Sequence, residues 1–368
     1  MISFSDLNLL ENPFKNITPI PGQNIEEELP WAGMKKVKKE IADIYRKGIE
    51  SSPRQIILNW GPYGGGKTFS SYHFLNQNFK TDKDILQVYV RSPKSGNSAD
   101  IEFFRTILDF ITFSKIRSRI KNLIENNSEN EIFKLVNSRI VSEEFTEAIL
   151  KIGEVKEENT EYIRRYLYTG LTKTELRKVG LHRNLDTPTD LIKLLTGIFI
   201  CFIGSEKYGQ GKIFLWVDEM EDLIYFTKKE YTAFSRLLRD LIDSLNNHFT
   251  LFMNFTLAEP DESTIEILLG DAINSRIDKR VRFDELNYED ALEYCSDLIH
   301  YYQIEKKKTI EPFTENALKL IFESIRGVDL IPRQINKKCS NLINYCIDNE
   351  ITLIDEKVTA KWLNSQDE

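Results

Sequence analysis

Four of the chain's 17 glycines fall between residues 61 and 66, in a segment that ends in Lys67 and Thr68. The spacing is GxxxxGK followed by Ser or Thr, and it stands after a short apolar run and before a stretch with helical spacing. Glycines let backbone N–H groups surround phosphate oxygens, and a helix N-terminus adds partial positive charge. A glycine-rich turn without a ligand would not explain the lysine and the threonine. The sequence therefore predicts a nucleotide-binding loop formed by Gly61, Pro62, Tyr63, Gly64, Gly65, Gly66, Lys67, Thr68 and Phe69.

The loop predicts phosphoryl chemistry, which also needs a metal ion and an activated water. In such a loop Lys67 reaches the β- and γ-phosphates and Thr68 ligates Mg²⁺. A second apolar run, residues 213–217, ends in Asp218 and Glu219. Ligands of open α/β sheets bind where the strands end. We therefore expect Asp218 to hold Mg²⁺ and Glu219 to polarise the attacking water as catalytic base, with a polar loop start as the alternative for this pair.

Further polar residues lie near these positions. Glu221 and Asp222 continue the acidic run, and we expect them to cap the following helix or to meet a partner. Asn254 and Thr256 lie on another apolar run, residues 249–256, and a period of two puts them on the same side of a strand. Either could orient the water or the γ-phosphate, and the sequence does not separate them.

Strands and helices that could position these residues alternate along the chain. Buried strands are predicted at 55–60, 84–90, 213–217 and 249–256, and a short edge strand at 281–283. Helices are predicted at 34–49, 67–79, 101–113 and 229–245. This alternation implies an α/β fold with a parallel sheet covered by helices. After residue 287 only helices are predicted, at 288–303, 314–326, 332–349 and 355–364, which indicates a separate helical domain.

Composition limits the class of protein. The chain is 41% hydrophobic with 22 Phe and 15 Tyr, so it lacks the signature of a disordered chain. Its net charge of −8 argues against a general electrostatic grip on nucleic acid or anionic lipid. The longest apolar stretch, residues 191–204, is too short to span a membrane and predicts a buried helix. No secretory signal is evident. The four cysteines lack metal or disulfide spacing, and we expect reduced core thiols in a cytoplasmic protein.

Taken together, residues 31–364 resemble the AAA+ ATPases. The similarity rests on the WAGM segment (Trp31–Met34), the glycine-rich loop, the acidic strand end, the polar residues of the fourth strand and two later arginines. The resemblance implies a P-loop NTPase fold, with ATP and Mg²⁺ bound under a C-terminal helical lid. It divides the chain into an arm (1–30), an ATP-binding domain (31–286) and a lid domain (287–368).

Two arginines gain roles through this resemblance. Residues 273–276 are similar to the arginine-finger segment of clamp loaders and origin-recognition-type ATPases, which implies that Arg276 acts in trans on a neighbour's site. Arg280 and Arg282 are alternatives, and a surface salt bridge is another role for each of them. Residues 327–333 resemble the sensor-2 motif, in which Arg333 would contact the nucleotide from the lid.

The spacing departs from the plain family pattern, because residues 112–205 stand as a large helical insertion before the acidic strand. Residues 166–181 near the end of this insertion, leading to residues 209–223, resemble origin-recognition-like ATPases of bacterial anti-phage systems, including BREX ATP-binding proteins. The segment Leu9–Phe14 is similar to ATPases of DNA transposition. Since the chain stops after the lid, we expect no C-terminal winged helix.

The leading hypothesis is a Mg²⁺-dependent ATPase that oligomerises, with itself or with related ATPase subunits, through nucleotide between subunits. It would control a protein partner, such as a nuclease or a transposase, in DNA transactions or phage defence. The alternative is a nucleotide-gated scaffold that recruits an effector with little turnover. DNA could contact a face formed on assembly. The basic residues 115–121 alternate along a predicted helix, so an exposed helix is favoured there over a DNA-binding face.

Overall fold

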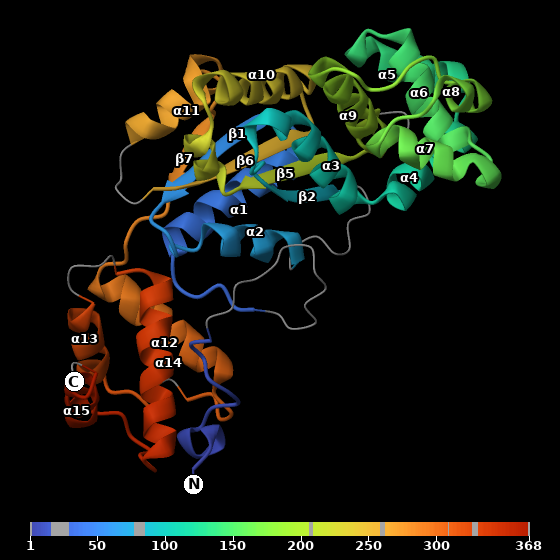
Figure 1. Cartoon of the computed structure of the whole chain (residues 1–368). Helices are drawn as coiled ribbons and strands as arrows, with labels where there is room; N and C mark the ends of the chain where they lie inside the picture. The colour runs from blue at the N-terminus through green and yellow to red at the C-terminus, as the bar shows by residue number, and fades with distance from the viewer. Residues whose placement is uncertain are drawn as a thin grey trace.

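The computed structural model describes residues 2–15, 29–76, 85–205, 209–257, 262–307, 309–325 and 330–366. Its centre is a five-stranded sheet in the order β2-β5-β6-β1-β7, with every pairing parallel (Figure 1). The strands are β1 (Gln55–Gly61), β2 (Ile85–Arg91), β5 (Lys212–Asp218), β6 (Phe249–Thr256) and β7 (Lys279–Arg282). The predicted α/β class and all five strands are confirmed, although β7 begins two residues earlier than predicted.

Helices cover both faces of the sheet (Figure 1). One face carries α1 (Lys35–Glu50) and α2 (Lys67–Asn76), and the other carries α3 (Ala99–Ile111), α9 (Pro188–Ile203), α10 (Lys228–Ser244) and α11 (Glu262–Asn274). Side chains alternate along β5: Leu215 packs toward α3 and α9, whereas Phe214 and Trp216 pack toward α1. Because both faces are buried, the strand is a continuous apolar run, which is typical of parallel sheets.

The helical region between β2 and β5 stands at one end of the sheet (Figure 1). It consists of α4 (Phe113–Asn126), α5 (Glu129–Ile140), α6 (Glu143–Glu154), α7 (Thr160–Tyr168) and α8 (Lys173–Val179). Fully buried side chains such as Ile120, Val136 and Ile149 join the core that α9 shares with the sheet. The predicted buried helix over 191–204 is therefore α9, and the region packs on it as a continuation of one core.

The C-terminal helices form a second layer beside α1 and α2 (Figure 1). They are α12 (Tyr288–Tyr302), α13 (Glu315–Ser324), α14 (Pro332–Asp348) and α15 (Glu356–Asn364), within two residues of the predicted bounds. Parts of the predicted elements lie outside the described residues: 77–79 of the second helix, 84 of the second strand, and 326–329 around the predicted lid arginine segment. All four cysteines are buried and free, as predicted.

The first residues pack on this helical layer (Figure 1). Residues 2–15 are irregular except for one turn of 3₁₀ helix, η1 (Phe4–Leu7). The Leu10 N–H donates to the Tyr302 carbonyl at 2.8 Å, and the Phe14 ring is fully buried with its centroid 5.8 Å from that of Phe313. The sequence predicted an arm at 1–30 but not this contact. Within the described residues, no helix is long and apolar enough to cross a membrane.

Candidate nucleotide-binding cleft

The glycine-rich loop connects the end of β1 to the start of α2. Gly61 has φ +151° and Gly64 has φ +87°, values that L side chains rarely adopt. A Cβ on Gly61 would lie 2.2 Å from the Phe283 carbonyl oxygen, and one on Gly64 would lie 2.8 Å from the Arg333 Cβ. The loop is therefore held between the end of β7 and the first turn of α14, with no room for side chains at these two positions.

Lys67 is the first residue of α2 and is 5% exposed. Its ammonium donates to the Gly61 carbonyl at 2.9 Å and to the Pro62 carbonyl at 2.8 Å. Burial lowers the pKa of Lys67 to about 8, even though the carboxylates of Glu221 and Asp218 favour its charged form. The loop thus carries a buried cation beside the N–H groups of a helix start, which have no partner within the helix.

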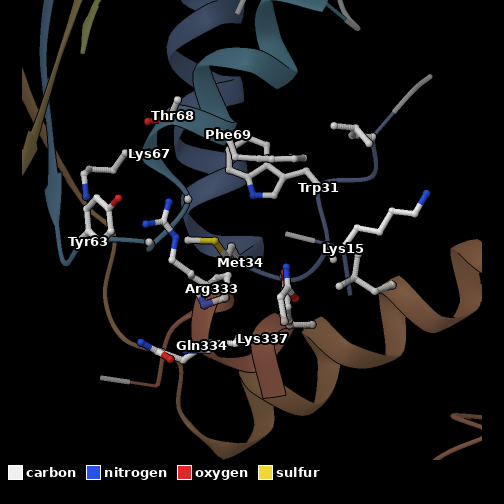
Figure 2. A pocket seen from close by; sticks show the side chains of 18 of the residues that line it. Lys15, Trp31, Met34, Tyr63, Lys67, Thr68, Phe69, Arg333, Gln334 and Lys337 are labelled. Atoms are coloured by element: carbon white, nitrogen blue, oxygen red, sulfur yellow. The ribbon is translucent and has the colours of Figure 1, made fainter. Parts of the chain in front are cut away.

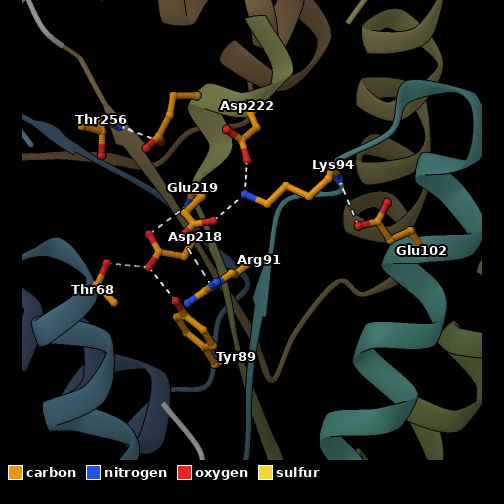
Figure 3. Close-up of polar contacts among 10 residues, drawn as sticks. Thr68, Tyr89, Arg91, Lys94, Glu102, Asp218, Glu219, Asp222 and Thr256 are labelled. Atoms are coloured by element: carbon orange, nitrogen blue, oxygen red, sulfur yellow. Dashed lines mark hydrogen bonds and ion pairs between the residues drawn. The ribbon is translucent and has the colours of Figure 1, made fainter. Parts of the chain in front are cut away.

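Asp218 ends β5 and faces the start of α2 (Figure 3). Its Oδ2 accepts hydrogen bonds from the Thr68 hydroxyl and the Tyr89 hydroxyl, both at 2.7 Å. Its Oδ1 accepts the Glu219 N–H at 3.0 Å. Asp218 and Thr68, the two residues predicted to hold a metal, are therefore in contact. Their carboxylate and hydroxyl oxygens are ligands that suit Mg²⁺.

Glu219 has a left-handed backbone, with φ +57°, and its carboxylate turns toward β2 and the loop after it (Figure 3). The Lys94 ammonium donates to its Oε2 at 2.6 Å, and the Arg91 Nε lies 3.5 Å from its Oε1. Lys94 also contacts Asp222. The candidate base is therefore engaged by two cations at the rim of the cleft.

The two polar residues of β6 have different surroundings. Asn254 is fully buried; it accepts a hydrogen bond from Asn59 at 2.9 Å and donates to the Ser71 hydroxyl at 3.1 Å. Thr256 ends the strand and lines the cleft, and its N–H donates to Glu221 at 3.0 Å. The structure brings Thr256 and not Asn254 to the cleft, because Asn254 lies two residues further back in the sheet. The sequence predicted that Glu221 caps the following helix or meets a partner; in the structure Glu221 lines the cleft.

These residues line a cleft of about 540 Å³ between the sheet and the C-terminal helices (Figure 2). The loop side contributes Tyr63, Gly64, Gly66, Lys67, Thr68 and Phe69, and the strand ends contribute Asp218, Glu219, Glu221 and Thr256. The opposite side comes from α12, the start of α14, and the segments around Pro13 and Trp31. The volume is in the range of small-ligand sites.

Arg333 reaches this cleft from the first turn of α14 (Figure 2). Its guanidinium carbon lies 4.1 Å from the centroid of the Tyr63 ring, and its positive charge acts on Lys67. The predicted lid arginine and the glycine-rich loop are therefore in direct contact. Gly327, which begins the segment predicted around it, lies outside the described residues.

Arg276 lies far from this cleft. It follows α11 and precedes β7, at the edge of the sheet where the parallel strands begin, whereas the loop and Asp218 lie where strands end. A seven-residue strand spans about 20 Å, so Arg276 does not reach the cleft of its own chain. Its Nε and one Nη each contact Asp243 at 2.7 Å. Of the two alternatives, Arg280 pairs with Glu266 at 3.3 Å and Arg282 lies 4.9 Å from the Trp60 ring centroid.

The basic residues of α4 make internal contacts. Arg119 donates to the carbonyls of Cys201 and Phe202 at the end of α9, at 2.9 and 3.1 Å. Arg117 donates to Glu157 at 2.7 Å and to the Val155 carbonyl at 2.8 Å. These two arginines therefore contact other parts of the chain between β2 and β5 and are not fully exposed, contrary to what the prediction of an exposed helix implied.

The sequence did not single out Tyr89, Arg91 or Lys94. A usable signal was present: once β2 is paired with β5 in parallel, Arg91 lies beside Asp218 in register, and Tyr89 shares its side of the strand. What the sequence lacks is the strand order, since nothing local in residues 85–91 determines which strand lies next to them.

No protein-family model matches the chain. A curated protein of Methanocaldococcus jannaschii, described as an uncharacterized HTH-type transcriptional regulator, is 32% identical over 93 residues. That match covers 25% of this chain and 22% of the regulator, so the chain spans only a small part of that protein.

Solved structures match over most of the chain. The Aeropyrum pernix ORC2 protein in ADPNP–ADP complexes aligns with a TM-score of 0.52 and 10% identity, covering 95% of this chain and 70% of that one. Drosophila ORC bound to DNA aligns with a TM-score of 0.50 and 11% identity, covering 95% of this chain and 63% of that one. The fold is that of AAA+ P-loop ATPases, with a central parallel sheet, a helical insertion and a helical lid.

Proposed function

We propose that the chain binds ATP with Mg²⁺ and hydrolyses it. The observation that carries the proposal is the contact between Thr68 and Asp218 beside the buried Lys67, on one wall of a cleft whose opposite wall comes from the lid. The loop fits a nucleotide polyphosphate, since three of its glycines adopt positive φ angles that side chains disfavour and the loop brings the Lys67 ammonium together with the N–H groups at the start of α2. Gly61 to Phe69 would surround the phosphates, and Lys67 would exchange its two carbonyl acceptors for phosphate oxygens.

The strand ends and the lid have complementary roles in this proposal. Thr68 and Asp218 would hold Mg²⁺, which when bound neutralises charge on the phosphate oxygens. Glu219 would take a proton from the attacking water once its carboxylate leaves Lys94. Thr256 would orient the water or the γ-phosphate from the end of β6. Asn254, two residues earlier, would stabilise this part of the strand. Arg333 would bind the phosphates from the lid.

Arg276 would complete the site of a neighbouring subunit, so that ATP lies between subunits of a homo-oligomer or of an assembly with related ATPases. Its distance from the cleft of its own chain supports action in trans. The domains in this proposal are the arm (1–30), the ATP-binding domain (31–286, with the insertion at about 112–205) and the lid (287–368).

We propose DNA transactions or phage defence as the setting. The printed names of the similar proteins, an ORC bound to DNA and an HTH-type transcriptional regulator, support a connection to DNA. The partner would be a nuclease or transposase of a BREX-like or transposition system, acting in the cytoplasm. A salt-dependent affinity for duplex DNA would support direct contact, because phosphate contacts weaken steeply with salt.

The test of hydrolysis is phosphate release by the wild type and by Glu219→Gln, with Glu147→Gln as a matched control on the exposed surface of the helical insertion. We expect Glu219→Gln to lower turnover at least a hundredfold and Glu147→Gln to leave it unchanged. Hydrolysis is rejected if the wild type releases no phosphate under any assembly condition.

The test of action in trans mixes two inactive variants, Lys67→Ala and Arg276→Ala. A mixed assembly contains some sites with both residues intact, so we expect activity to return on mixing and the oligomer to form in the presence of ATP. Activity that stays absent in a verified mixed oligomer contradicts action in trans.

A nucleotide-gated scaffold is the second candidate. It is favoured by the engagement of Glu219 with Lys94 and Arg91, which withholds the candidate base. In that case ATP would still drive assembly, Glu219→Gln would assemble and recruit the effector as the wild type does, and the two proteins would release phosphate at the same low rate.

A further inference from the structure

The acidic run from Asp218 to Asp222 contacts both the cleft and Lys94, and Glu219 takes part in both. After Glu219 the chain turns into η4 (Met220–Tyr225), a 3₁₀ helix, in which residues three apart lie above one another. Glu219, just before this helix, and Asp222 within it both contact Lys94, while Asp218, Glu219 and Glu221 line the cleft.

Two apolar side chains fix this arrangement. Met220 and Leu223 are fully buried in the core on the α3 and α9 side of the sheet. They lie three residues apart and therefore share one side of this 3₁₀ helix, which they anchor in the core. The burial of Met220 and Leu223 therefore fixes η4, and with it the position of Glu221.

Glu221 lies where the hydrogen-bond ladder between β5 and β6 stops. The pairing of these strands ends at Val217 with Met253, whereas β6 continues to Thr256 along β1. The Leu257 N–H donates to Gly61 on the β1 side, so the Thr256 N–H points to the opposite side, where no strand residue accepts it. The Glu221 carboxylate accepts it at 3.0 Å and takes the place of a strand carbonyl.

We infer that Glu221 is a positioning residue: it fixes the end of β6 to the segment that carries Asp218 and Glu219, and so presents the Thr256 hydroxyl to the cleft. Its effect on turnover rests on the proposed ATP hydrolysis, but its effect on β6 does not. Burial raises the pKa of Glu221, in keeping with a carboxylate held among protein groups at the cleft wall.

The test compares Glu221→Gln, Glu221→Ala, Thr256→Val and the double variant of Glu221→Ala with Thr256→Val. The first readout is amide hydrogen exchange of residues 249–257. A glutamine oxygen can still accept the Thr256 N–H, so we expect exchange there to stay near the wild-type rate in Glu221→Gln and to speed up about tenfold in Glu221→Ala. Glu147→Ala is the matched control for loss of an exposed carboxylate. Unchanged exchange in Glu221→Ala overturns the inference.

The second readout is steady-state turnover. We expect Glu221→Ala to lower kcat about tenfold with less than a twofold change in KM, Glu221→Gln to retain most of kcat, and the double variant to be no slower than Thr256→Val alone. Additive losses mean that Glu221 does not act through Thr256 and overturn the inference. If the wild type hydrolyses no ATP, the proposed function fails, whereas the exchange measurement still decides the role of Glu221.

Discussion

Two charged residues of the cleft, Lys67 and Glu219, are each held by contacts within the protein. The Lys67 ammonium is buried on two loop carbonyls, and the Glu219 carboxylate lies against Lys94. In the proposed reaction Lys67 has to exchange its carbonyl contacts for phosphate, and Glu219 has to exchange Lys94 for water. Each exchange leads to a measurable effect.

ATP affinity should fall as the pH rises above about 8. The pKa of Lys67 is lowered to about 8 by burial, and the negative phosphates of ATP favour the protonated form. Binding above that pH therefore takes up a proton, and the affinity falls by up to about tenfold per pH unit. Phosphate groups titrate with a pKa of roughly 6 and are fully charged by then.

The measurement is the dissociation constant of ATP between pH 7 and pH 9.5. Lys67→Met is the control, because it should bind weakly and without this slope. An affinity of the wild type that stays constant up to pH 9.5 contradicts the lowered pKa.

Lys94→Met should raise turnover severalfold without changing ATP affinity. Lys94 makes the shorter of the two cation contacts to the Glu219 carboxylate and does not line the cleft, so its removal leaves only Arg91, at 3.5 Å, on the base and leaves the binding surface intact. The Lys94 side chain is 57% exposed, so the cost in stability should be below about 1 kcal/mol. Lys121→Met, which removes an exposed lysine paired with Glu125, is the matched control. A fall in kcat for Lys94→Met would mean that Lys94 assists the reaction.

At the scale of elements, the turn between α5 and α6 contains backbone strain. Val141 has φ +48° and ψ +52°, a left-handed conformation that is unusual for a β-branched residue, and it is 79% exposed. Its side chain therefore contributes little packing to offset the strain.

Val141→Gly should stabilise the protein by about 1 kcal/mol, because left-handed geometry costs about 1–2 kcal/mol for L residues and glycine adopts it freely. The measurement is the free energy of unfolding in urea. Val141→Ala keeps the strain and should change stability little. A loss of stability in Val141→Gly would show that the valine side chain makes a favourable contact.

The elements themselves were largely predictable from sequence. The strands and the four lid helices follow from hydrophobic periodicity and from capping residues such as Thr314 and Asp355, which are local properties. The contact of Lys94 with Glu219 was not predictable, because it needs the β2–β5 pairing and the left-handed turn at Glu219. The choice between Asn254 and Thr256 likewise depends on how far each residue lies from the end of β6.

At the scale of the whole molecule, the arm and the start of the ATP-binding domain both contact the lid. The Asn12 amide donates to the Ser340 hydroxyl at 2.9 Å, and the Gly33 N–H donates to Asp297 on α12 at 2.8 Å. One apolar core runs from Leu9 through the lid to the face of the sheet under α1. The cleft is thus walled by segments from both ends of the chain.

Phe14→Ala should destabilise the protein by about 3 kcal/mol, the cost of truncating a buried aromatic side chain, and should weaken ATP binding. The reason for weaker binding is that Pro13 and Lys15, which flank Phe14, line the cleft. Leu10→Ala is the matched control, since Leu10 is on the same arm but 65% exposed.

Urea unfolding and the dissociation constant of ATP measure the two effects of Phe14→Ala. Equal stability and equal affinity in the two variants would contradict a structural role of the arm.

The sequence by itself determined the glycine-rich loop, the acidic strand end and the α/β alternation, because spacing, turn chemistry and hydrophobic period are local and survive in any arrangement of the elements. Only the tertiary structure decided that Glu219 and Asp222 meet Lys94, that Glu221 and Thr256 reach the cleft, and that the first residues pack on the lid. These facts depend on contacts between residues far apart in the chain, which packing selects and local pattern does not record.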